Sequence, residues 1–165
     1  MTLKVMTLSA AMLTLPIPTE GTVDTERREK PVDSGQHAQG SFEVKVTPVG
    51  GADHGVASAH LTLEKTFAGD LIGTSRGDMW TAGATVEGSG GYVAIEKIEG
   101  SLHGRKGSFT LIHQGTMRRG GDYQMRLVVV PDSGTDQLAG LTGTMTIRIE
   151  KGAHFYDLDY TLPTH

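Results

Sequence analysis

The chain has 165 residues, with 15 Lys and Arg against 19 Asp and Glu, a formal net charge of −4 and a pI near 5.9. This balance gives no electrostatic reason to expect binding to nucleic acid or to an anionic membrane. The chain has no cysteine, which excludes disulfides, thiolate catalysis and cysteine-ligated zinc. We expect no metal and no cofactor, because the seven histidines lack a metal-ligand spacing and no nucleotide-binding motif is present.

The first 38 residues differ in composition from the rest of the chain. A mildly apolar run at residues 5–17 is followed by a polar, Pro- and Gly-containing run at residues 19–39. We interpret residues 1–38 as an arm, flexible or loosely docked, and residues 39–165 as one domain. The apolar run is too short and too polar for a membrane span. The expected location is the cytoplasm; the alternative is export through a degenerate N-terminal signal.

Eight segments of the domain show the alternation of apolar and polar residues that predicts β-strands, each bounded by turn residues. In the first, Phe42, Val44 and Val46 alternate with polar neighbours. Eight consecutive antiparallel strands most simply close into a barrel, which removes exposed edges; a sandwich is the alternative. The predicted strands are residues 41–48, 56–67, 70–80, 92–102, 107–117, 122–131, 141–150 and 153–162.

Two polar residues, Glu96 and His113, interrupt apolar strand faces in the fourth and fifth segments. A two-residue type II′ turn at Gly104 and Arg105 would place them directly opposite each other. A slip of one residue would move one of them to the other face of the sheet. We therefore predict a buried acid–imidazole pair, able to act in general acid–base catalysis. The alternative is a satisfied internal contact without catalysis.

Three further polar side chains are predicted on the inward face, Lys65, Tyr156 and Tyr160. A second tight turn, at Lys151 and Gly152, sets the register of the two tyrosines. In a barrel of eight strands, inward polar groups must bond to one another, to water or to a ligand. We expect substrate-binding roles for these three residues. The alternatives are that Lys65 extends to the barrel mouth and that the tyrosines only pack.

Four runs resemble the bacterial domain-of-unknown-function family 3224, over about residues 39 to 162. They are KTFAGDLIGTSRGDM, GYVAIEKIEGSLHGRKGSFTLIHQGTM, VVVPDSGTDQLAGLTGTMTI and HFYDLDYTL. The family is similar in fold to the allene oxide cyclase barrel. The resemblance implies a closed antiparallel eight-stranded barrel with an apolar cavity, usually in a homo-oligomer, but it supplies no reaction. We interpret the glycines and the PxSGT loop of the family pattern as architectural. The pattern falls here on Lys65, Asp70, Gly100, Gly104, Arg105, Gly107, His113, Ser133, Gly134, Thr135, His154, Tyr156 and Tyr160.

Three functions follow from this reading. The leading one is a small soluble barrel that binds a hydrophobic small molecule and isomerises, cyclises or hydrates it. Glu96 and His113 would be the acid–base pair, and by analogy with allene oxide cyclases Glu96 would serve as the active-site carboxylate. The second is a carrier or sensor without turnover. The third is an assembly protein whose barrel is filled by its own side chains.

Overall fold

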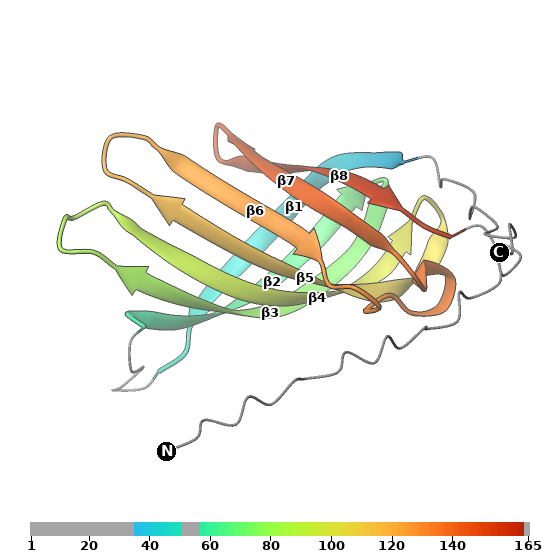
Figure 1. Cartoon of the computed structure of the whole chain (residues 1–165), viewed down its shortest axis with the longest axis horizontal. Helices are drawn as coiled ribbons and strands as arrows, with labels where there is room; N and C mark the ends of the chain where they lie inside the picture. The colour runs from blue at the N-terminus through green and yellow to red at the C-terminus, as the bar shows by residue number, and fades with distance from the viewer. Residues whose placement is uncertain (1–34, 51–56, 164–165) are drawn as a thin grey trace, which may run out of the picture. The chain divides into compact units, whose positions relative to one another are not determined.

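The computed structural model describes residues 35–50 and 57–163, which form a closed barrel of eight antiparallel strands in sequence order (Figure 1). The predicted fold class is thus confirmed. Within the described ranges no helix is long and apolar enough to cross a membrane. The strands are β1 (Gln36–Pro48), β2 (Ala59–Gly69), β3 (Leu71–Gly83), β4 (Gly90–Leu102), β5 (Arg105–Met117), β6 (Tyr123–Val129), β7 (Thr142–Glu150) and β8 (Ala153–Thr161), and one 3-10 turn, η1 (Asp136–Leu138), precedes β7.

The alternation read from the sequence matches the burial seen in the strands. In β2, Leu63 and Phe67 are buried inside the barrel, whereas Glu64 and Thr66 between them are exposed. This is the pattern that a pleated strand produces when one face packs on a core. All eight predicted strands are present, with shifted ends.

Strand β1 begins earlier than the sequence indicated. It starts at Gln36, and Ala38 is completely buried opposite Leu158 of β8. Residues 36–38 therefore belong to the barrel and not to the arm in which we had placed them. An alanine and two polar residues carry too little apolar signal to reveal a strand end by alternation.

The turn between β4 and β5 is not the one expected. It consists of His103 and Gly104, both with positive φ (47° and 81°), and Arg105 already belongs to β5. Two central residues with positive φ make a type I′ turn, which matches the twist of the flanking strands. The predicted type II′ turn at Gly104 and Arg105 was wrong by one position.

The register of β4 and β5 is consequently shifted by two residues. Glu96 lies opposite Leu111, and His113 lies opposite Ala94. The expected direct pairing of Glu96 with His113 was therefore wrong. A shift of two residues keeps every side chain on its face of the sheet, so both residues still point into the barrel.

The interior is divided along the barrel axis. We call the end with the β2–β3, β4–β5 and β6–β7 connections the closed end, and the end with the β3–β4, β5–β6 and β7–β8 hairpins the open end (Figure 1, right and left). Toward the closed end the interior is filled by the barrel's own side chains. These are mainly Leu71, Ile98, Leu102, Phe109, Leu111, Leu138, Leu141, Tyr156, Leu158, Tyr160 and Leu162.

The loop between β6 and β7 is fastened to the first half of β5. Ser133 Oγ accepts the amide hydrogen of Thr110 at 3.0 Å and donates to the carbonyl of Val130 at 2.7 Å. Thr135 Oγ accepts the amide hydrogen of Ser108 at 3.0 Å. These bonds satisfy backbone groups of β5 in the stretch where β6 does not pair with it. The serine and threonine of this loop are thus architectural.

Candidate functional site

The open half of the barrel contains a pocket of about 500 Å³ that opens to solvent at the open end. Small-molecule sites commonly measure roughly 300–1,000 Å³ and have mostly apolar walls with a few polar groups. This cavity has both properties. Its apolar walls include Phe42, Val44, Leu63, Met79, Met125 and Ile147, and its polar side chains include Lys65, His113, His154, Tyr92 and Tyr123.

The floor of the cavity is a cluster of four buried polar residues, which we call the floor cluster: Lys65, Ser75, Glu96 and His113. Lys65 Nζ donates to Glu96 Oε2 at 2.6 Å, and Ser75 Oγ donates to Glu96 Oε1. His113 Nε2 lies 3.1 Å from Glu96 Oε2, in an ion-pair contact that is not aligned as a hydrogen bond. Glu96 is completely buried, whereas Lys65 and His113 are 6% and 4% exposed and line the cavity. Of the floor cluster, only Lys65 and His113 can therefore touch a bound molecule.

Glu96 is ionised despite its burial. Burial by itself would raise the pKa of this carboxyl. Contacts with His113, Lys65 and Ser75 outweigh burial and lower the pKa from 4.5 to about 2. The carboxylate is therefore an anion throughout the neutral range and does not donate a proton there.

The small inward side chains of β3 make room for Glu96. Gly77 is directly opposite Glu96 in the ladder, and Ser75 is the next inward residue. A Cβ on Gly77 would lie 2.4 Å from the Ile95 carbonyl oxygen and 3.0 Å from Glu96 Cβ. A larger residue at position 77 would thus collide with the backbone of β4 at Ile95 and Glu96.

Two aromatic rings flank the Lys65 ammonium. Its Nζ lies 4.9 Å from the ring centroid of Phe42 and 5.9 Å from that of Phe67. Ring faces attract a cation at such distances, and they add to the ion pair with Glu96. The rings and the carboxylate together hold the Lys65 side chain in place at the cavity floor.

Tyr92 extends the polar surface above His113. The two rings meet edge to face with centroids 6.1 Å apart, and the Tyr92 hydroxyl lies 3.3 Å from that of Tyr123. Burial, together with this hydroxyl contact, raises the pKa of Tyr92. Its hydroxyl therefore remains protonated and can donate to a ligand.

The structure does not bring Tyr156 and Tyr160 to the floor cluster. Both lie in the filled half and neither lines the cavity. Tyr156 Oη accepts the amide hydrogen of Leu71 at 2.8 Å, and Tyr160 Oη contacts His103 Nδ1 at 2.7 Å and donates to Gln36 Oε1 at 2.9 Å. These bonds connect distant strands at the closed end, so we leave both tyrosines out of the site.

Sequence reasoning missed Ser75 and did not connect His154 with the cavity. Ser75 is a small residue in a Gly-rich strand, and its one signal is its inward position beside the residue that pairs with Glu96. His154 packs its ring 5.1 Å from Phe42 at the cavity wall. Within residues 35–50 and 57–163, no group of three or more His, Asp or Glu side chains is arranged to hold a metal ion.

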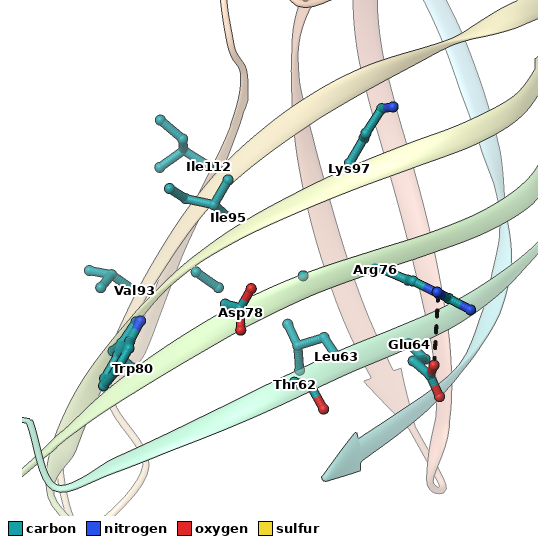
Figure 2. Close-up of a pocket in the computed structure, with 12 residues that line it drawn as sticks. Thr62, Leu63, Glu64, Arg76, Asp78, Trp80, Val93, Ile95, Lys97 and Ile112 are labelled. Carbon is teal, nitrogen blue, oxygen red and sulfur yellow. Dashed lines mark ion pairs between the residues drawn. The ribbon is translucent and has the colours of Figure 1, made fainter. Parts of the chain in front are cut away.

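A second hollow, of about 710 Å³, lies on the outer surface of β2 to β5. Figure 2 shows its apolar side chains, Val93, Ile95 and Ile112, beside Trp80, with Arg76 and Glu64 joined by an ion pair of 3.9 Å. Its charged side chains are largely exposed to solvent, so they lack the close, dry contacts of the floor cluster. The interior cavity is therefore the better candidate site.

Comparison with known proteins agrees with the fold. The family model DUF3224, described as a protein of unknown function, matches residues 38–160. A crystal structure of a protein with unknown function from the same family, from Shewanella oneidensis MR-1, is 44% identical and superposes with a TM-score of 0.71. That likeness covers 79% of this chain and 99% of the other. No curated protein matches the chain. The protein is a member of the DUF3224 family.

Proposed function

We propose that the barrel binds an apolar small molecule in its open half, and that the floor cluster acts on one polar group of that molecule. The observation that carries this proposal is a cavity of about 500 Å³ with apolar walls, into which Lys65 and His113 project from a buried polar floor. Well-packed apolar side chains often stabilise a protein as much as a buried ion pair does, so charges placed beside a cavity favour a role in ligand binding.

The roles within the floor cluster differ from those expected of a simple acid–base pair. Lys65 and His113 contact the ligand. Glu96, which is ionised and does not line the cavity, is a positioning residue that orients the other two. A carboxylate that fixes an imidazole in this way is a common arrangement in general acid–base catalysis.

A carrier or sensor without turnover is the second candidate. Three methionines, Met79, Met117 and Met125, line the cavity. Flexible thioether side chains adapt to ligands of different shape, which suits a carrier. The third candidate, a barrel filled by its own side chains, fits the closed half alone.

Binding can be tested with N-phenyl-1-naphthylamine, a neutral apolar dye that fluoresces when it leaves water. We expect saturable binding to the wild type and its loss in Val44→Trp, which fills the cavity from β1. Lys45→Trp is the matched control, because the neighbouring side chain is exposed on the outer surface. Equal dye binding by the two variants would contradict the proposed site. Native mass spectrometry of gently purified protein would show the mass of a natural ligand.

A further inference from the structure

The position of Glu96 indicates which nitrogen of the His113 ring carries the proton when the imidazole is neutral. Nε2 lies 3.1 Å from an ionised carboxylate oxygen, off the line of a hydrogen bond, and the negative charge beside it favours the neutral tautomer with the proton on Nε2. Nδ1 is then the basic nitrogen. His113 lines the cavity while its Nε2 is buried against Glu96, which leaves the rest of the ring for contact with a bound molecule.

Lys65 is the second group that a ligand would meet. Among the described residues, its ammonium has Glu96 as its hydrogen-bond acceptor, so donor hydrogens remain for a ligand. Lys65 Nζ and His113 Nε2 contact the same carboxylate oxygen, Glu96 Oε2. A base and a cation thus lie side by side on the cavity floor.

The charge of the floor cluster restricts the ligand. One ammonium and one carboxylate cancel when His113 is neutral, and the walls around them are apolar. An anionic group would add an unbalanced charge to this nearly buried floor, whereas a carbonyl oxygen could accept a hydrogen bond from Lys65 without adding charge. The site therefore favours a neutral carbonyl compound.

We propose that the cavity takes an apolar ketone and that His113 is the catalytic base that moves a proton between two of its carbon atoms, with Lys65 stabilising the enolate. This inference rests on the proposed function and names its substrate class and reaction. It accounts for the three ionisable members of the floor cluster: a base, a cation, and a carboxylate that orients both.

For a β,γ-unsaturated ketone the reaction balances without any further reactant. His113 Nδ1 takes a proton from the carbon between the carbonyl group and the double bond. The C–H electron pair forms a new carbon–carbon double bond, and the carbonyl π pair moves to the oxygen, beside the Lys65 ammonium. The protonated imidazole, stabilised by Glu96, then returns its proton to the γ carbon, and the product is the conjugated ketone. A fixed cation stabilises the enolate more strongly in this apolar site than water would.

The test uses 3-cyclohexen-1-one, whose conversion to 2-cyclohexen-1-one is followed by the ultraviolet absorbance of the conjugated ketone. We expect the wild type to exceed the buffer rate, and His113→Gln, which keeps a donor toward Glu96 but has no basic nitrogen, to lose on the order of 10²–10⁴-fold in kcat/KM. His60→Gln is the control, because His60 stacks on Trp80 at the outer surface, with centroids 4.0 Å apart. Its rate should equal that of the wild type. Equal rates in His113→Gln and the wild type would overturn the proposal.

A second probe separates this inference from the proposed function. When 4-nitrophenol gives its proton to His113 it resembles the enolate and adds no net charge. Its binding beside Lys65 should therefore increase the phenolate absorbance at a given pH, and Lys65→Gln should abolish the increase. If N-phenyl-1-naphthylamine binds but the ketone neither isomerises nor exchanges its α hydrogens for deuterium, the inference is wrong and the binding function stands. If that dye does not bind either, both are wrong.

Discussion

Replacing Glu96 by Gln should destabilise the barrel strongly at neutral pH. The change preserves shape but leaves the Lys65 ammonium, 6% exposed, without its counter-charge. Removing one partner of a buried ion pair typically costs about 3–5 kcal/mol. The floor cluster therefore predicts a large loss of stability although Gln preserves the size of the side chain.

The lowered pKa of Glu96 gives a second measure of how much this carboxylate contributes to stability. A pKa that falls from 4.5 to about 2 on folding corresponds to about 3 kcal/mol of stability. Because the folded value is the lower one, this stabilisation is complete above pH 5 and is lost as the pH falls through 4.5 toward 2. By the same relation less than half of it remains at pH 3. The difference in stability between wild type and Glu96→Gln should therefore shrink in acid.

The assay is urea unfolding of both proteins at pH 7, 5, 4 and 3, followed by far-ultraviolet circular dichroism. Taking the difference between the two proteins cancels the titration of groups that do not contact Glu96. Glu99→Gln is the control, since Glu99 lies on the same strand but faces solvent and pairs with Lys97 at 2.8 Å. Exposed pairs contribute about 0–1 kcal/mol. A Glu96→Gln protein as stable as the wild type at pH 7, or a difference independent of pH, would refute the reasoning.

Three further predictions concern the frame of the barrel. Removing residues 1–34 should leave cooperative thermal unfolding intact, whereas removing residues 1–38 should lower the midpoint, because it deletes buried Ala38 and the Gln36 side chain that accepts from Tyr160. Equal midpoints would show that the start of β1 contributes nothing. Tyr156→Phe should cost about 1–3 kcal/mol in urea unfolding, since it leaves the buried amide of Leu71 without its acceptor. Lys151→Asn should stabilise by about 0.5–1 kcal/mol, because Lys151 has a φ of 51° in a two-residue type I′ turn that prefers Asn-Gly; a loss of stability would contradict this.

Local sequence determined the strands and the faces on which their side chains lie. The period of two in β2 or β7 is a property of neighbouring residues, so burial of Leu63 and exposure of Glu64 can be read directly. The turn at Lys151 and Gly152 also depends only on neighbouring residues. The register that it sets for the tyrosines is confirmed, since Ile147 lies opposite Tyr156. The shared inward face of Glu96 and His113 followed from the same periodicity and is also confirmed.

The tertiary structure decided how far along the axis each inward residue lies. The β4–β5 turn could be placed at either of two adjacent positions, and this choice alone shifted the register by two residues. Strand tilt and closure then placed Lys65 and Ser75 beside Glu96 and put Tyr156 and Tyr160 in the filled half. Periodicity specifies the face of a strand, but it carries no information on axial position. That position depends on how all eight strands are staggered when the barrel closes.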